Sequence, residues 1–321
     1  MTWEGFPKVE LHLHLEGAAP PAFIRAEAAR RGVPPPPVFG ADGGYRWQGF
    51  GGFLAAYEAA CAVLSGPDAY ARLAAAVLAD RAADGVVHAE IFIAPQLIAG
   101  GDPVAFAEHW AAIRSVSCPG ISIAWIAIAV RHLGPQGALE TARLAAASAG
   151  LAGFGMAGDE RFGHPADFAP AFDLAREAGL ALTVHAGEFG GPDSVAAALD
   201  HLRPARIGHG VRAIESPALV ARLAAEGIVL EVCPGSNIAL GLYPDWAAHP
   251  VAALDRAGVR ITLSTDDPPW FATRLSLEYA ALARTHGWGP EDFRRFNRTA
   301  AAAAFCDAAT RAGILARLEG A

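Results

Sequence analysis

Short apolar, β-branched runs alternate with longer alanine-rich stretches along this chain, and this alternation restricts the folds that it can adopt. Strands that alternate with helices form βαβ units around a parallel sheet. Eight such repeats within 321 residues favour a (β/α)8 TIM barrel over an open doubly wound sheet. No G-x-G-x-x-G motif follows an early strand, which argues against a dinucleotide-binding sheet. The predicted strands are Val9–Leu13, Val86–Ile93, Ile121–Val130, Leu151–Met156, Leu180–His185, Arg206–His209, Ile228–Cys233 and Arg260–Thr265.

Helical patterns fill the intervals, and several begin with proline in the first turn and end near a glycine. No linker marks a boundary, so residues 1–321 are predicted to form a single domain. Extra helices are expected after the first strand and at the C-terminus, over Leu275–Thr285, Pro290–Phe296 and Thr299–Leu318. The predicted helices between strands are Pro67–Ala83, Pro103–Ser115, Pro135–Ala149, Pro165–Ala178, Pro192–Leu202, Ser216–Glu226 and Pro250–Ala257.

One insertion, Gly32–Gly52, interrupts the alternation. It contains four consecutive prolines, Pro34 to Pro37, and many glycines, so it is predicted to be neither helix nor strand. Because it follows the first strand and its helix, it is expected either to fold over the barrel mouth as a lid or to form a plain surface loop.

The overall composition excludes several classes of function. A formal net charge of −8 without a basic stripe argues against nucleic-acid partners. The N-terminus lacks a basic and apolar leader pattern, and no apolar run is long enough to span a bilayer, so no membrane partner is expected. These features predict a soluble, cytoplasmic protein.

Lysine and cysteine usage narrows the chemistry further. Lys8 is the only lysine among 25 basic residues, and it does not follow a glycine-rich turn, so a Walker phosphate loop or a pyridoxal Schiff base is not expected. The cysteines are scattered, which argues against a disulfide framework or a thiolate zinc site and predicts small buried apolar residues. They are Cys61, Cys118, Cys233 and Cys306.

The first predicted strand carries a His-x-His pair. His12 and His14 are two residues apart in an alternating segment, so both imidazoles leave the same face of the strand. Two converging imidazoles make half of a zinc site, whereas the alternative is a pair of histidines on a hydrated strand face.

Three later strands also end in polar residues, which a barrel would bring together at its C-terminal face. The fifth ends in His185 and is followed by Glu188, the sixth ends in His209, and the eighth leads into Asp266 and Asp267.

This convergence predicts one catalytic zinc ion per chain, with water as a fifth ligand that becomes acidic enough to react near neutral pH. The predicted protein ligands are His12, His14, His185 and Asp266. Glu188 can deliver a proton to the substrate, His209 can hydrogen-bond the water and take its proton, and Asp267 can accept a hydrogen bond from the substrate.

Each of these residues also has a plainer interpretation when it is taken alone. His185 or His209 would be a structural histidine, Asp266-Asp267-Pro268 an ordinary turn, and Glu188 an acid in the first turn of a helix that complements its dipole. The other histidines are interpreted as structural, with weak alternatives for His88 within a strand and for Arg131 and His132 near the mouth. These histidines are His88, His109, His132, His164, His201, His249 and His286.

At these positions the chain resembles the adenosine deaminase family of the amidohydrolase superfamily. The resemblance implies a zinc-dependent barrel that hydrolyses the 6-amino group of a purine. The matching segments follow the family order and span almost the whole chain. They are His12-Leu13-His14-Leu15-Glu16-Gly17, Ala157-Gly158-Asp159-Glu160, His185-Ala186-Gly187-Glu188, Gly208-His209-Gly210 and Ser264-Thr265-Asp266-Asp267-Pro268.

The resemblance also implies residue roles. Glu188 would protonate purine N1, His209 would orient and deprotonate the attacking water, and Asp267 would bond to N7. The backbone N–H of Gly158 would meet N3, with His14 and Glu16 as further substrate-binding residues.

The resemblance leaves the substrate open. The first expectation is deamination of adenosine or deoxyadenosine to the inosine product, and the alternative is free adenine or aminodeoxyfutalosine. Glu16 and Gly155 replace the aspartates of adenosine deaminases. Glu16 is typical of adenine deaminases and aminodeoxyfutalosine deaminases, whereas Gly208 is typical of nucleoside-type enzymes. The complete set of polar residues argues against a non-catalytic purine-binding barrel, and the lack of a mid-barrel lysine argues against a binuclear amidohydrolase. The oligomeric state is not indicated.

Overall fold

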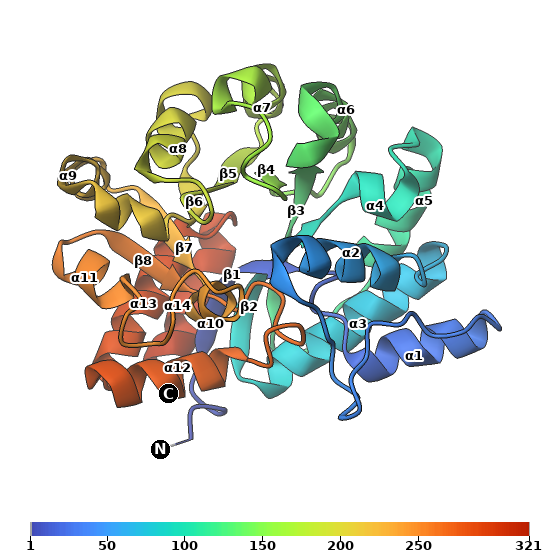
Figure 1. Ribbon diagram of the computed structural model, residues 1–321, viewed down its shortest axis with the longest axis horizontal. Coiled ribbons are helices and arrows are strands. Elements are labelled where there is room, and N and C mark those ends of the chain that lie inside the picture. Colours follow the sequence, from blue (N-terminus) through green and yellow to red (C-terminus); the bar gives the residue numbers. More distant parts are fainter. Residues whose placement is uncertain (1, 321) are drawn as a thin grey trace.

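The computed structural model describes residues 2–320. Eight parallel strands follow one another in chain order in a single sheet that curls into a barrel, which confirms the (β/α)8 prediction (Figure 1). The strands are β1 (Lys8–His14), β2 (Val86–Ile93), β3 (Ser122–Val130), β4 (Gly153–Ala157), β5 (Ala181–Ala186), β6 (Arg206–His209), β7 (Val229–Val232) and β8 (Arg260–Leu263).

The first and last strands meet at a narrow seam. The backbone N–H of His14 donates to the carbonyl of Asp266 (3.1 Å), and the N–H of Asp266 donates to the carbonyl of His12 (3.1 Å). Together they form a parallel bridge between Leu13 and Asp266. The barrel therefore closes beside the predicted metal ligands.

Helices pack around the outside of the sheet, and most begin with a proline, whose missing N–H costs nothing in the first turn (Figure 1). They are α1 (Pro21–Arg30), α2 (Gly49–Cys61), α3 (Pro67–Ala83), α4 (Pro95–Ala99), α5 (Pro103–Arg114), α6 (Gly134–Ala147), α7 (Ala169–Glu177), α8 (Pro192–Ala197), α9 (Pro217–Glu226), α10 (Pro234–Ala239), α11 (Val251–Arg256), α12 (Leu275–His286), α13 (Pro290–Ala303) and α14 (Ala308–Glu319).

Helix α2 departs from the predicted non-helical insertion, because Gly49–Gly52 form its first turn. The glycines disfavour a helix, but Phe50 and Phe53 supply an apolar face at helical spacing. The ring centroids of Phe50 and Phe189 are 4.1 Å apart, and those of Phe53 and Phe271 are 5.3 Å apart. Tertiary packing therefore outweighs local propensity here.

The C-terminal helices also differ from prediction. Helix α13 continues through Asn297, where a break was expected, because the Asn297 amide donates to the carbonyl of Phe293 (2.8 Å) while its oxygen accepts from the N–H of Val9 (2.8 Å). The polar side chain thus docks the helix onto β1 instead of ending it. The break comes later, where the Asp307 carboxylate accepts from the N–H of Thr310 (2.7 Å) and caps α14.

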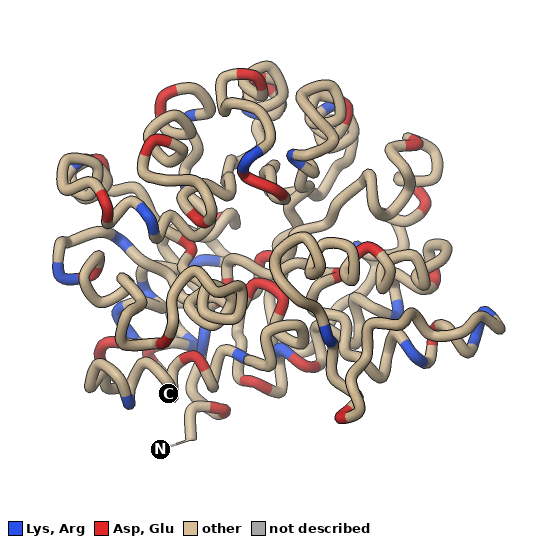
Figure 2. The backbone as a smooth tube through the Cα atoms, in the orientation of Figure 1, with Lys and Arg blue, Asp and Glu red and all other residues tan. Residues whose placement is uncertain are grey.

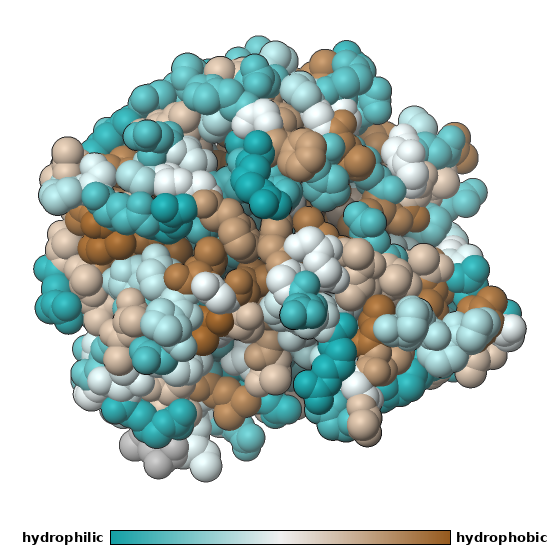
Figure 3. Space-filling view, in the orientation of Figure 1, coloured by the Kyte–Doolittle hydropathy of each residue, from teal (hydrophilic) through white to brown (hydrophobic). Residues whose placement is uncertain are grey.

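Both signs of charge are interspersed over the outer helices and loops (Figure 2). Apolar side chains gather near the centre of the face in Figure 3. No helix within residues 2–320 is long and apolar enough to cross a membrane. All four cysteines are free, but Cys118 and Cys306 are only half-buried, so the prediction of buried cysteines holds for Cys61 and Cys233 alone.

Lys8 lies at the opposite end of the barrel from the strand termini discussed below. Its ammonium is buried and donates to the carbonyls of Phe6 (2.9 Å), Glu4 (3.4 Å) and Asp84. The only lysine thus ties together backbone at the base of the barrel, a role that the sequence did not indicate.

Candidate active site

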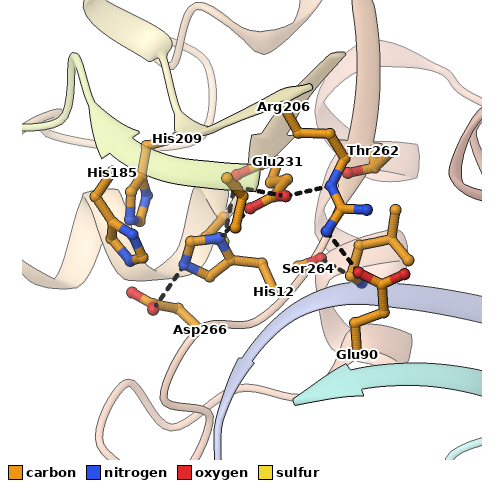
Figure 4. Close-up of polar contacts among 12 residues, drawn as sticks. His12, Glu90, His185, Arg206, His209, Glu231, Thr262, Ser264 and Asp266 are labelled. Carbon is orange, nitrogen blue, oxygen red and sulfur yellow. Dashed lines mark hydrogen bonds and ion pairs between the residues drawn. The ribbon is translucent and has the colours of Figure 1, made fainter. Parts of the chain in front are cut away.

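The polar strand ends predicted to converge do so. His12 and His14 end β1, His185 lies in β5, and Asp266 follows β8; one potential ligand atom from each lies within 4.8 Å of all the others. Figure 4 shows His12, His185 and Asp266 facing one another. The parallel sheet explains this convergence, because all of its strands end at the same face of the barrel.

The separations between these atoms fit a small divalent cation. The Nε2 atoms of His12 and His14 lie 3.3 and 3.2 Å from Oδ1 of Asp266, and the Nε2 atoms of His14 and His185 are 3.3 Å apart. Ligands held about 2.0–2.1 Å from a tetrahedral ion would lie about 3.3–3.4 Å apart. Nε2 of His12 is buried and makes no well-directed hydrogen bond. This donor set therefore suits a bound metal.

Two of the site residues adopt backbone angles that most side chains avoid. His209 and Asp266 have φ values of 58° and 66°, in the left-handed region. At Asp266 the chain leaves the barrel while its carboxylate still faces the histidines. Strain of this kind concentrates at functional sites.

Gly208 permits the histidines to pack closely. A Cβ at this position would lie 2.9 Å from Cε1 of His12 and 3.2 Å from Nδ1 of His185. The glycine is therefore explained by packing around the histidines and carries no necessary information about the substrate.

Glu231, which the sequence pattern did not single out, lies directly behind the ligand cluster. Its buried carboxylate accepts from Nδ1 of His12 (2.8 Å) and from the hydroxyl of Thr183 (2.9 Å), and it pairs with Nε of Arg206 (2.5 Å) (Figure 4). The bond to Nδ1 fixes the ring so that Nε2 of His12 faces the ligand cluster, where it would bind a metal once its proton is displaced. Although burial opposes ionisation, the charge of Arg206 and the hydrogen bond from His12 lower the pKa of Glu231 to about 2.

This buried charge network extends away from the site. Arg206 also pairs with Glu90 and donates to the carbonyl of Ala303 (2.7 Å), which ends α13. In the sequence, this network is signalled only by charged residues of both signs in the middle of apolar strands, where an unpaired charge would be costly.

Glu188 and His209 lie next to the ligand cluster. Oε1 of Glu188 is 3.7 Å from Nε2 of His209. One potential ligand atom from each of Glu188, His209 and Asp266 lies within 4.8 Å of the other two, so these residues form a second group that could hold a metal. The amide of Asn237 donates to Nδ1 of His209 (3.2 Å), so Nε2 faces the site. Asp266 is held separately, because Oδ2 accepts from the hydroxyl of Ser236 (2.7 Å).

Burial sets the charge state of these groups. It raises the pKa of Glu188 well above its usual range, assisted by the negative charges of Asp266 and Glu160. Burial and the charge of Asp266 also raise the pKa of Asp267. Burial lowers the pKa of His209 to about 3, which leaves the imidazole neutral. The site thus combines groups that can hold a proton with a neutral imidazole.

Burial also acts on the pKa values of the three histidines in the cluster, but the outcome is not the same for all of them. Burial lowers the pKa of His185 well below its usual range and also lowers that of His14, so both keep a lone pair. For His12 burial acts in the same direction, but the neighbouring carboxylates of Asp266 and Glu231 outweigh it and raise the pKa to about 9, so a metal at Nε2 would have to displace a proton.

A single cavity joins the predicted substrate residues to the cluster. His14, Glu16, Gly158 and Asp267 line it together with Glu188 and His209, and the other walls are mostly apolar. One carboxyl oxygen of Glu16 is buried and makes no hydrogen bond. His132, at the mouth, also lines the cavity.

Arg131 does not reach the cavity, because it donates to the carbonyls of Phe162 (2.7 Å) and Gly163 (2.9 Å). His88 is likewise structural: it lies buried in β2 and bonds to the hydroxyl of Ser122 (2.8 Å).

The insertion reaches the mouth at only one end. Among residues 32–52, Phe50 alone lines the cavity. The preceding stretch is fastened to the loop after β8, where the rings of Tyr45 and Trp270 stack with centroids 3.8 Å apart and Nε1 of Trp47 donates to the carbonyl of Trp270 (3.2 Å). The covering element is therefore helix α2, and the proline-rich stretch lies outside the mouth.

Comparison with known proteins agrees with this geometry. The family model described as "Adenosine deaminase" matches residues 7–321. A protein from Chelativorans sp. named adenine deaminase is 48% identical over 318 residues, which cover 97% of this chain and 98% of the relative. A protein of the same name from Agrobacterium fabrum is 46% identical over 317 residues, which cover 97% of each chain.

Solved structures show the same fold and arrangement along the chain. The crystal structure of adenine deaminase from Arthrobacter aurescens has a TM-score of 0.91 and 31% identity, covering 98% of both chains. A zinc-bound amidohydrolase from Burkholderia ambifaria has a TM-score of 0.87 and 31% identity, covering 99% of this chain and 91% of that one. With its barrel, its converging histidines and aspartates and these matches over nearly its full length, this chain belongs to the adenosine deaminase family.

Proposed function

We propose that this protein hydrolyses adenine to hypoxanthine and ammonia with the help of one zinc ion. The observation that carries the proposal is the convergence of His12, His14, His185 and Asp266 beside Glu188 and His209 in one cavity. The relatives named adenine deaminase support the free base over the adenosine that the first sequence expectation favoured.

The four converging side chains would hold the metal, and the zinc bound by the Burkholderia relative supports its identity. When bound, the ion supplies Lewis acidity that makes water a competent nucleophile near neutral pH.

The remaining polar groups act on the purine and the water. Glu188 delivers a proton to ring atom N1, which makes C6 more electrophilic. Nε2 of His209 hydrogen-bonds the water and orients it toward C6. Asp267 forms a hydrogen bond with N7, and the backbone N–H of Gly158 donates a hydrogen bond to N3. Each of these residues lines the same cavity.

Glu16 supports adenine as the substrate. A free base carries a ring N–H that a nucleoside has lost to the sugar, and a buried donor needs an acceptor. Glu16 is 5% exposed, and one of its carboxyl oxygens is unpartnered within the described structure. It therefore offers the acceptor that a buried free base requires.

A substrate panel tests the proposal. Zinc-loaded protein is assayed by ultraviolet absorbance with adenine, adenosine, deoxyadenosine and aminodeoxyfutalosine. We expect kcat/KM to be highest for adenine. A higher value for any nucleoside would reject adenine as the substrate, and turnover of none of them would reject the reaction.

A pair of variants tests the proton donor. Glu188→Gln should keep its metal and lose about 10²–10⁴-fold in kcat, because the amide cannot deliver the proton. Glu58→Gln is the matched control, since Glu58 lines the same cavity but is exposed at its rim. Full activity in Glu188→Gln would show that Glu188 is not the proton donor.

A further inference from the structure

A buried carboxylate lies directly behind the loop that carries Glu188. Glu160 follows β4 and is 6% exposed. Its Oε1 accepts from the N–H of Gly187 (2.6 Å), and its Oε2 accepts from the N–H groups of Glu188 (3.1 Å) and Gly190 (2.7 Å). The hydroxyl of Ser194 also donates to Oε1. One carboxylate thus accepts from three backbone N–H groups of a single loop and from one hydroxyl.

The loop is shaped to admit this carboxylate. Gly187 has φ of 74°, which most other residues would adopt only with strain. A Cβ at Gly190 would lie 2.5 Å from Oε1 of Glu160 and 2.7 Å from Cβ of Ser194. Both glycines therefore allow the backbone to wrap closely around Glu160.

We propose that Glu160 is a positioning residue that holds the Glu188 side chain at the purine through the backbone of residues 187–190. The inference rests on the proposed role of Glu188. Glu160 does not line the cavity, so its effect on catalysis passes through the loop. Because Glu188 must meet a single ring atom, a displacement of about 1 Å is expected to cost about 10²-fold in rate.

The substitution Glu160→Gln tests the carboxylate without changing its size. Each oxygen of Glu160 accepts from two donors. Whichever way the amide is placed, its NH2 group would face at least one backbone N–H, because of the four donors only the Ser194 hydroxyl can turn and accept. The loop must then move to relieve the mismatch.

The decisive experiment is a double-mutant cycle on the metal-loaded protein. Glu160→Gln alone should lower kcat by about 10²-fold with its metal content unchanged. In a Glu188→Gln background the same substitution should change the residual kcat by about twofold or less, because the group that it positions has gone. A full 10²-fold loss in that background, or loss of the metal, would show that Glu160 has a different role.

A second measurement does not depend on turnover or on folding of Glu160→Gln. Ser194→Ala removes one of the four donors, and Asp193→Ala, at an exposed neighbouring position, is its control. Hydrogen exchange of the amides in residues 187–190 should become faster in Ser194→Ala and stay unchanged in Asp193→Ala. Equal exchange in both would overturn the proposal, whereas failure of the substrate panel alone would leave this result intact.

Discussion

Replacing Glu231 with glutamine should weaken metal binding although Glu231 touches no metal. The carboxylate faces Nδ1 of His12 on one side and Arg206 with Thr183 on the other. In Glu231→Gln the amide oxygen will stay with the charged Arg206, so the NH2 group must turn toward Nδ1 of His12. Nδ1 must then accept, which moves the imidazole proton to Nε2, the atom that faces the ligand cluster.

The size of the effect follows from this change of tautomer. Loss of a partner behind a ligating histidine typically costs 10–100-fold in metal affinity, or about 1.4–2.7 kcal/mol. The folded protein should also lose about 1–3 kcal/mol, because the bonds of a buried charged carboxylate are replaced by bonds of a neutral amide. The loss of stability should not exceed this range, because Arg206 still pairs with Glu90 and its buried charge is not left without a partner.

Competition with a chromophoric zinc chelator measures the affinity, and thermal unfolding of the metal-free protein measures the stability separately. Glu278→Gln is the control. Glu278 is fully buried and accepts from the N–H of Gly235 (3.0 Å) and the hydroxyl of Thr273 (2.6 Å), and burial raises its pKa to about 8. It is mostly uncharged at pH 7, so this substitution should leave zinc affinity unchanged. A folded Glu231→Gln protein that binds zinc as tightly as the wild type would refute the reasoning.

Gly208→Ala should lower both zinc affinity and stability, the latter by about 1–3 kcal/mol, because its Cβ would lie 2.9 Å from Cε1 of His12; unfolding curves and chelator competition check this. Removing the metal should lower the midpoint of thermal unfolding, since an ion present at 100 times its Kd adds about 2.7 kcal/mol to stability; the midpoint should return when zinc is restored. Burial lowers the pKa of Lys8 to about 8 from its ordinary 10.5, so the unfolded chain binds more protons between these values and stability should rise with pH across that window. Urea unfolding at pH 7.5 and 9.5 should show this rise in the wild type but not in Lys8→Met, and equal slopes would contradict it.

The barrel and the cluster were predictable because their signals are local and repeat. The bounds of β2 and β6 agree with the sequence prediction, since each is a compact run between clear helix patterns. Strand β8 ends at Leu263, two residues before the predicted end, while Asp266, in a left-handed conformation, still bridges to Leu13. Polar residues at successive strand ends indicate a common site once the barrel is recognised.

The supporting groups were not predictable in the same way. Glu231 and Glu160 each act through partners that the fold alone brings near, such as His12 for Glu231 and the Gly187–Gly190 backbone for Glu160. A charged residue inside an apolar strand signals that some partner exists, but it does not identify that partner. The substrate is harder still, because Glu16 and Gly208 suggested different purines and Gly208 is explained by packing alone.

The seam between β1 and β8 has a consequence for the order of events during synthesis. His12 and His14 leave the ribosome early, whereas Asp266 lies about 250 residues later and forms the bridge that closes the barrel. At about 5–20 residues per second, the ribosome needs roughly 10–50 seconds to add that stretch. For this interval the nascent chain carries a His-x-His pair without its carboxylate partner, so an ion captured early is held by an incomplete set of ligands. Under the proposed function, secure binding of the metal would thus be one of the last steps in making this protein.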